Sequence, residues 1–361
     1  MTLTLYFFRQ FIPPFVFGTF LFLFVMFLNK LFDLIDLIFN KGVQAVMVGK
    51  LFLLFLPTII PLIMPMAILL ACVVAFGRMS EENELTAVRA GGISLLKVFW
   101  LPPLLALVVS FFMVPFNTQL APQSSQLFRK IYEEIAQADP LVNIEPKKFF
   151  SIKNIRIYTE SIDKKSNLMR NVLVFQNNAD GRPTDRIFAQ TGSIVSGNDT
   201  FTMVLGTGQL ERFDTLDPKK ILHITFGTYR IQLPLKMDTD SKTVRFRNVS
   251  SQELKKMIQD MRAQGLPTAP LQAEDNLRYA IAFAPLALTM IGIPLATVLK
   301  RGGRTFSFGI TLMVTFAYYT MLVLGLTLAE KGILPPLPSL WIANILCFIL
   351  GLFLFRRMIR Q

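Results

Sequence analysis

Six stretches of the chain are apolar over lengths that suit a helix crossing a lipid bilayer. A transmembrane helix needs roughly 20 such residues to span a hydrocarbon layer of about 30 Å. The six runs lie at about 11–39, 48–76, 95–116, 277–299, 306–329 and 337–355. The first run is longer than the roughly 7–15 apolar residues of a signal peptide, and no cleavage site of small residues follows it. We therefore expect it to remain as the first of six membrane helices.

Between the third and fourth runs, apolar and polar residues alternate along the chain. Ile155 with Ile157, and then Phe201, Met203 and Leu205, each mark one face of a β-strand. Turn-forming residues separate such segments at a spacing of about 10 residues, which is typical of a sandwich or jelly roll. We predict a β domain at about 143–247. Its apolar faces either pack as a closed core or line a groove that receives an apolar ligand.

A short helix is predicted at about 250–264, between the β domain and the fourth apolar run. Ser250 and Glu253 form a capping box, and Gly265 with Pro267 ends the helix. We expect this helix to rest on the membrane surface or on the β domain and to connect it to the fourth membrane helix.

The predicted fold class is an α-helical polytopic membrane protein with an inserted all-β, jelly-roll-like domain. Its six transmembrane helices are divided three plus three. The expected segments are 1–118 for the first three helices, 119–275 for the polar interval and 276–361 for the last three helices.

The composition and the charge agree with this topology. The chain is 52% hydrophobic, has a mean hydropathy of +0.48 and carries a formal net charge of +13. Basic residues near helix ends mark cytoplasmic loops. Here they gather in segments that fall on one side if there are six spans: Arg9, Arg78, Arg89, Lys97, Lys300, Arg301, Arg304, Arg356, Arg357 and Arg360. We therefore expect cytoplasmic termini and a periplasmic interval, and the charge does not call for nucleic acid.

Little in the sequence supports catalysis. Cys72 and Cys347 lie inside apolar runs, and the single histidine, His223, lies in a β-like stretch. No phosphate-binding loop of the form G-x-x-x-x-G-K-[ST] is present. We expect no metal site, no cofactor, no catalytic residue and no ATPase site in this chain.

The loop between the second and third runs is predicted to hold a short, self-capped helix at about 78–91. Ser80 can cap its beginning, and Glu82 lies in its first turn, where the helix dipole favours acids. Arg89 lies in its last turn, and Gly91 permits a left-handed ending. Such a helix either docks into a partner protein or lies on the membrane surface.

This loop carries a resemblance to a known family. The segment G-R-M-S-E-E-N-E-L-T-A-V-R-A-G-G, residues 77–92, resembles the coupling helix of the lipopolysaccharide-export permeases, the LptF/LptG family. The rest of the chain agrees in order, including the basic, glycine-containing turn at 300–304 and the pair Tyr318 and Tyr319 in the fifth helix. The ordered combination is specific, although no single short motif is.

The resemblance implies one half of an ABC exporter in the inner membrane of a Gram-negative bacterium. Such a permease extracts lipopolysaccharide and passes it toward the outer membrane. The implied partners are a cytoplasmic ATPase dimer, a second homologous permease, a single-span periplasmic jelly-roll protein and a periplasmic bridge protein. ATP hydrolysis then belongs to the partner, and the F-like and G-like halves both remain open.

The resemblance also implies roles for residues. Glu84, supported by Glu82, would dock beside a basic residue of the ATPase, and the same short helix presents Leu85, Val88, Arg89 and Gly91. Lys30 would meet lipid A phosphates, unless it pairs with Asp33. Phe201, Met203 and Leu205 would meet acyl chains, unless they form a closed core.

Three prolines, Pro57, Pro61 and Pro65, recur every fourth residue of the second run. Each removes a helical hydrogen bond, so this helix is either statically bent or deforms as a gate opens. Two other classes of function remain alternatives. One is a secondary transporter, although no Asp, Glu or His for a proton relay is visible in the second to sixth runs. The other is a membrane-anchored scaffold whose β domain only recruits partners.

Overall fold

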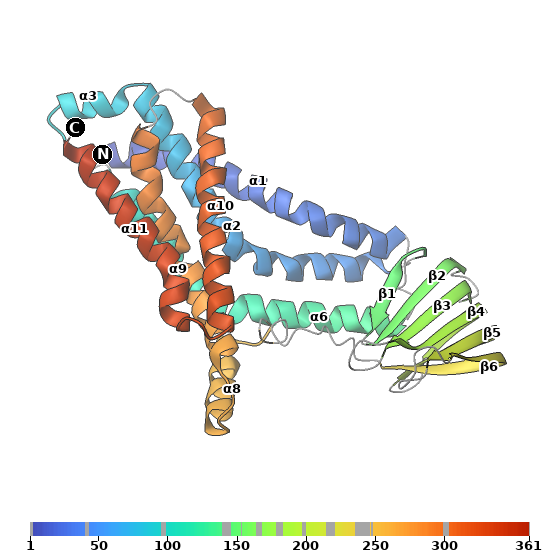
Figure 1. Ribbon diagram of the computed structural model, residues 1–361. Helices are drawn as coiled ribbons and strands as arrows, with labels where there is room; N and C mark the ends of the chain where they lie inside the picture. Colours follow the sequence, from blue (N-terminus) through green and yellow to red (C-terminus); the bar gives the residue numbers. More distant parts are fainter. Residues whose placement is uncertain are drawn as a thin grey trace. The chain divides into compact units, whose positions relative to one another are not determined.

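The chain divides into two compact units in a computed structural model. The structure describes residues 3–39, 43–94, 99–138, 146–152, 154–163, 168–177, 183–196, 200–213, 221–234, 246, 248–298 and 303–360. The helical unit comprises Met1–Ile35, Gly49–Phe128 and Phe246–Gln361. The sheet unit comprises Asp36–Val48 and Arg129–Arg245. Figure 1 labels the helices and strands of both units.

Six helices in the described part of the chain are long and apolar enough to cross a membrane. Their spans are Leu5–Leu28, Ala45–Glu81, Leu101–Tyr132, Ala269–Thr297, Ser307–Glu330 and Pro336–Met358. The corresponding helices are α1 (Leu3–Phe39), α2 (Ala45–Glu81), α5 (Leu101–Pro115) continued by α6 (Ala121–Ala138), α9 (Ala269–Val298), α10 (Gly303–Glu330) and α11 (Pro336–Arg360). The prediction of six membrane helices, three on each side of a β region, is confirmed.

The third span is longer than the apolar run that predicted it. After α5 the chain passes through a π-helical turn, η1 (Phe116–Leu120), directly into α6. Pro122 has no backbone N–H to continue an α-helical ladder, and the π-helical turn precedes it. Leu127, Ile131 and Ile135 then recur every fourth residue. The helix therefore continues as an amphipathic one, although the continuous apolar run ends near residue 116.

The interior of the helical unit is built around α2 and α9, the two most deeply buried spans. Ala67, Leu69 and Ala71 of α2 have no exposed surface. Small residues allow helices to approach closely, and a Cβ added at Gly292 of α9 would lie 2.8 Å from a side-chain carbon of Leu69. α2 remains one continuous helix although Pro57, Pro61 and Pro65 lie inside it.

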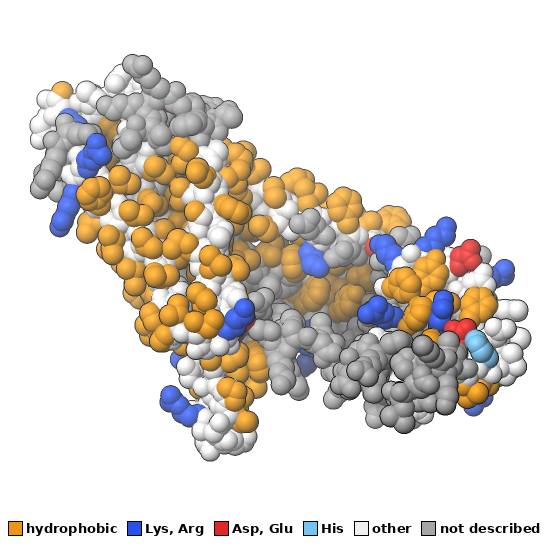
Figure 2. Space-filling model, in the orientation of Figure 1, with side chains coloured by type: hydrophobic (Ala, Val, Ile, Leu, Met, Phe, Trp, Pro, Cys, Tyr) orange, Lys and Arg blue, Asp and Glu red, His pale blue; other side chains and the backbone are white. Residues whose placement is uncertain are grey.

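The outside of the helical unit is apolar over much of its surface. Figure 2 shows hydrophobic side chains spread over its visible face. Large aromatic residues are among the exposed ones: Phe17, Phe20, Phe24, Phe111, Phe112, Phe316 and Phe353. Soluble proteins rarely expose contiguous apolar patches of this kind, so these side chains suit contact with lipid or with another membrane helix.

The sheet unit holds a six-stranded antiparallel sheet. The strands are β1 (Phe149–Ile152), β2 (Ile155–Asp163), β3 (Leu168–Asn177), β4 (Pro183–Ser196), β5 (Thr200–Phe213) and β6 (Ile221–Pro234). They neighbour one another in sequence order. The predicted inserted β domain is confirmed, and the described strands form a single meander without a crossover. A jelly-roll arrangement remains a prediction.

Because side chains alternate between the two faces of a strand, the apolar residues of the strands gather on one buried face of the sheet. Ile157 pairs with Val174, and Val174 pairs in turn with Ile187, so these three buried side chains share one face. With Met203 and Leu205 they belong to a single buried cluster. On the other face, a hollow of about 550 Å³ is lined by Phe149, Tyr158, Glu160, Asn171, Leu173 and Phe188.

The predicted connector helix is present as α8 (Ser251–Ala263). The hydroxyl of Ser250 accepts a bond from the Glu253 amide at 3.3 Å, and the Glu253 carboxylate accepts one from the Ser250 amide at 3.4 Å. The capping box predicted from these two residues is therefore confirmed. Gly265, with a φ of +69°, follows the helix end.

Candidate functional site

The loop predicted to hold the coupling helix folds as a sharp corner between two helices. α2 continues through Ser80 to Glu81, the chain turns at Asn83, and α3 (Glu84–Ala90) follows. Asn83 has a left-handed φ of 58°, which Asn tolerates better than most residues. We call residues 78–92 the α2–α3 corner; Figure 1 shows α3 at this corner.

Ser80 does not cap the short helix, so that prediction was wrong. Its side chain is buried inside the last turns of α2, and its hydroxyl donates to the Thr297 carbonyl of α9 at 3.4 Å. The residue before α3 is Asn83, which makes no side-chain capping bond. The Ser80 hydroxyl therefore bonds to the neighbouring helix α9 instead of capping α3.

Of the other features predicted for the corner, the positions of Glu82 and of the left-handed residue differ in the structure, and the position of Arg89 agrees. Glu82 lies between α2 and α3 rather than in a first helical turn, and it pairs with Arg78 at 2.8 Å on an exposed surface. Gly91 has an ordinary φ of −74°, and Gly92, with a φ of +71°, is the left-handed residue. The left-handed ending was thus predicted one residue too early. Arg89 lies in the last turn of α3, as predicted, and donates to the Met358 carbonyl of α11 at 2.8 Å.

The apolar face of α3 is directed into this protein. Leu85 is buried, and Val88 packs against the same cluster, which also holds Phe7 and Phe11 of α1 and Phe76 of α2. Leu85 and Val88 thereby attach α3 to the helical unit. The polar side chains of α3 are consequently the ones left for a partner.

Glu84 begins α3 and is partly exposed. Its Oε1 accepts a hydrogen bond from the Tyr6 hydroxyl of α1 at 2.5 Å, and Gln10 donates to that hydroxyl at 2.9 Å. Glu84 Oε2 is shielded from solvent and has no hydrogen-bond partner among the described residues. A carboxylate oxygen left in this state retains acceptor capacity that an incoming donor can satisfy.

The predicted substrate-binding residues are not brought together as one site. Lys30 is exposed on α1, and the side chains of Asp33 and Phe201 lie outside the described residues. Met203 and Leu205 of β5 have no exposed surface and belong to the buried cluster of the sheet. In this structure the sheet face that carries them is closed.

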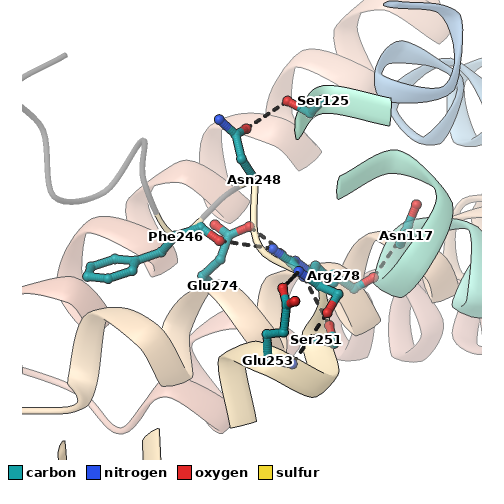
Figure 3. Close-up of polar contacts among 9 residues, drawn as sticks. Asn117, Ser125, Phe246, Asn248, Ser251, Glu253, Glu274 and Arg278 are labelled. Carbon is teal, nitrogen blue, oxygen red and sulfur yellow. Dashed lines mark hydrogen bonds and ion pairs between the residues drawn. The ribbon is translucent and has the colours of Figure 1, made fainter. Parts of the chain in front are cut away.

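A buried polar cluster around Arg278 was not singled out from the sequence. Arg278 of α9 donates to Glu274 Oε1 at 3.3 Å, to Ser251 Oγ at 3.1 Å and to the Phe246 carbonyl at 3.2 Å. Figure 3 shows the guanidinium group between these partners. Arg278 and Glu274 are 5% and 9% exposed, respectively, so the charges are shielded as well as paired.

The same cluster joins two connecting segments of the chain. One is η1 with α6, which precedes the sheet, and the other begins at Phe246, which follows it. Asn117 of η1 donates to the Arg278 carbonyl at 3.0 Å, and Ser125 of α6 donates to Asn248 at 2.7 Å (Figure 3). We call these residues the Arg278 clasp. Glu274 and Arg278 lie four residues apart at the start of the fourth apolar run. Opposite charges at this spacing pair on one face of a helix, and this was the sequence signal from which the cluster could have been predicted. α9 begins at Ala269, earlier than predicted, so its span does contain acidic residues.

Among the described residues, no group of three or more His, Cys, Asp or Glu that could hold a metal ion occurs. The Tyr279 hydroxyl, 3.2 Å from the Lys255 amine of α8, raises the pKa of that amine above its ordinary value.

These features define a multi-pass membrane protein with a β domain inserted between its third and fourth spans. The chain matches the family of lipopolysaccharide export system permeases, LptF/LptG, over residues 5–357. It therefore belongs to this family.

A curated relative also matches part of the chain. It is an uncharacterized protein of Rickettsia prowazekii (strain Madrid E), 24% identical over 233 residues. The match covers 63% of this chain and 62% of the relative. The chain thus spans less than two thirds of that relative's length, and nothing in the relative's name describes an activity.

Proposed function

We propose that this chain is the permease half of an ABC exporter that extracts lipopolysaccharide from the inner membrane and passes it to a periplasmic bridge. The observation that carries the proposal is the family match over residues 5–357, together with six membrane-competent helices around an inserted sheet. The lipid delivered in this way would reach the outer membrane of a Gram-negative bacterium.

The proposed topology places both termini and the α2–α3 corner in the cytoplasm and the sheet in the periplasm. Basic residues at helix ends support it, because positively charged loops are retained on the cytoplasmic side. Arg78 and Arg89 lie at the corner, and Arg356 and Arg357 lie in the last turns of α11.

The corner is the proposed docking site for a cytoplasmic ATPase dimer. Glu84 offers a carboxylate with an unsatisfied oxygen, and a basic side chain of the ATPase would form a charge-assisted bond with it. Leu85 and Arg89 fix α3 to the helical unit, so a displacement of α3 would be transmitted as a rigid movement. Hydrolysis of ATP would take place entirely in the partner.

The other proposed partners are a second homologous permease, a single-span periplasmic jelly-roll protein and the bridge protein. The exposed aromatic side chains of the helical unit suit packing against the second permease and contact with lipid. Lys30, exposed on α1, is the proposed contact for lipid A phosphates. β1 and β6 are the outer strands of the sheet, and such edges accept a partner strand through main-chain hydrogen bonds.

The sheet is the proposed path for acyl chains. Met203 and Leu205 lie on its apolar face, and shielding each CH₂ group from water contributes about 0.8 kcal/mol. Because this face is closed in the structure, passage of a chain requires the cluster to open. The proposal therefore couples opening of the sheet to the ATPase cycle.

The experiment is release of lipopolysaccharide from proteoliposomes that contain the permease pair, the ATPase and the bridge protein. Glu84→Ala should weaken association of the ATPase by about tenfold or more and reduce ATP-dependent release. The matched control is Glu330→Ala, the same change at a partly exposed glutamate of α10 that lies outside the α2–α3 corner. Release without ATP, driven by an ion gradient, would indicate a secondary transporter. Absence of release in every condition, with partners still bound, would indicate a scaffold.

A further inference from the structure

The first membrane helix contacts the proposed docking carboxylate directly. Tyr6, in the second turn of α1, donates its hydroxyl proton to Glu84 Oε1, and Gln10, one turn further along α1, donates to the Tyr6 oxygen. Because Gln10 occupies an acceptor position of the hydroxyl, the Tyr6 proton remains available for the carboxylate. The three side chains form a directed chain that ends on Glu84.

The Tyr6 contact matters because the Glu84 side chain has three rotatable bonds and stands at the beginning of a seven-residue helix. Leu85 and Phe7, the neighbours of Glu84 and Tyr6 in sequence, belong to the same buried cluster. The backbones of α1 and α3 are therefore already held together next to this bond. The hydroxyl adds a constraint on the carboxylate itself, which the packing of Leu85 does not supply.

We infer that Tyr6 is a positioning residue for the docking carboxylate. It holds Glu84 so that the unpaired Oε2 can satisfy a basic side chain of the ATPase after a small rotation of the soft terminal torsion. A side chain held in one geometry before association loses less conformational entropy when the partner binds. The inference rests on the proposed function, since it requires Glu84 to meet the ATPase. Through the Tyr6 hydroxyl, the docked carboxylate would be hydrogen-bonded to α1.

The test compares Tyr6→Phe, Glu84→Ala and the double variant in the full permease pair reconstituted in nanodiscs. The ATPase subunit is titrated, and both its half-saturating concentration and the maximal rate of ATP hydrolysis are measured. Tyr6→Phe removes a single hydroxyl from a side chain that is 42% exposed. Hydrogen bonds to charged groups are stronger than neutral ones, so we expect the half-saturating concentration to rise about 3–10-fold with the maximal rate unchanged.

The double variant separates positioning from a general structural role. If Tyr6 acts through Glu84, Tyr6→Phe should have no additional effect in the Glu84→Ala background. An equal effect in both backgrounds would overturn the inference, and so would a lower maximal rate at an unchanged half-saturating concentration. Gln10→Leu removes the donor to the Tyr6 oxygen and should shift the titration in the same direction but less. Leu5→Ala, a change at an exposed neighbour of Tyr6, is the matched control and should leave the titration unchanged.

The outcomes also distinguish this inference from the proposed function. A shift with Glu84→Ala and none with Tyr6→Phe or Gln10→Leu would reject Tyr6 as a positioning residue and leave Glu84 as the docking group. No shift with any of these variants would reject Glu84 as the docking group and the inference with it.

Discussion

The hydroxyl of Tyr319 on α10 donates a hydrogen bond to the Leu62 backbone carbonyl on α2, 2.8 Å away. Leu62 directly follows Pro61, in the segment of α2 where three prolines recur. The adjacent Tyr318 points its hydroxyl elsewhere, to Asn344 of α11 at 2.8 Å. A pair of neighbouring tyrosines therefore connects α10 to both α2 and α11.

Tyr319→Phe should lower the thermal stability slightly and alter the transport rate. Interhelical hydrogen bonds in membranes contribute on average about 0.6 kcal/mol, so the loss of stability should be of this order. If the proline segment of α2 deforms during transport, releasing its contact with α10 should change the rate of lipid release. Tyr318→Phe is the matched control, because it removes the same group from a contact that does not involve α2. Equal transport rates for both variants would indicate a statically bent α2.

Arg278→Met should destabilise the helical unit strongly. The substitution leaves the Glu274 carboxylate, 9% exposed, without the guanidinium group 3.3 Å away. Breaking a buried ion pair from one side typically costs about 3–5 kcal/mol, whereas replacing both partners by apolar residues is often much less harmful. The double variant Arg278→Met with Glu274→Met should therefore recover much of the lost stability.

Thermal unfolding in detergent, followed by intrinsic fluorescence, measures these changes. Lys255→Met is the control, since its partner Tyr279 is uncharged and the contact is largely exposed; its effect should stay below about 1 kcal/mol. A double variant as unstable as Arg278→Met would show that the bonds to Phe246 and Ser251, rather than the ion pair, dominate the Arg278 clasp.

Single cysteines at Thr225 and Thr86 should react with a membrane-impermeant thiol reagent from opposite sides of the inner membrane. Both threonines are exposed, Thr225 on β6 and Thr86 on α3, so their replacement is well tolerated by the packing. The native Cys72 and Cys347 are buried and are replaced by alanine in the background. Thr225→Cys should label from the periplasm of intact cells, and Thr86→Cys only after the membrane is permeabilised. Labelling of both in intact cells would contradict the proposed orientation.

A photo-crosslinking residue at Met203 should capture lipopolysaccharide only when the ATPase is supplied with ATP. Met203 has no exposed surface in the structure, so a lipid can reach it only after the apolar face of the sheet opens. The control position is Phe188, on the opposite face and 43% exposed, where capture should not depend on ATP. Absence of capture at Met203 in every condition would mean that this face is a permanent core.

The elements that the sequence predicted correctly are those governed by local pattern. Six apolar runs became six membrane-competent helices, because a helix is the structure in which a single segment satisfies its own backbone in lipid. Alternating residues such as Ile155 and Ile157 became strands. The capping box of Ser250 and Glu253 formed as predicted, since both partners lie within one helical turn.

By contrast, contacts between distant segments decided the details of the candidate site. Ser80 bonds to Thr297, 217 residues away, and Leu85 packs in a cluster with residues of α1 and α2. No local pattern reports such neighbours, so the α2–α3 corner was predicted as one capped helix. Its turn at Asn83 depends on how α2 and α3 pack against the rest of the helical unit.

The sequence by itself determined the number of spans and the position of the β insertion, because hydrophobic periodicity encodes both. It also located the proposed docking segment, through its charged helix-end residues and the resemblance of residues 77–92 to the coupling helix of the family. Only the tertiary structure decided which groups meet there. It paired Glu84 with Tyr6 of α1, closed the Met203 face of the sheet, and gathered Arg278, Glu274 and the two connecting segments into the Arg278 clasp. The physical reason is that a buried or half-buried polar group acquires its role from the partners that desolvate and bind it, and those partners are distant in the chain.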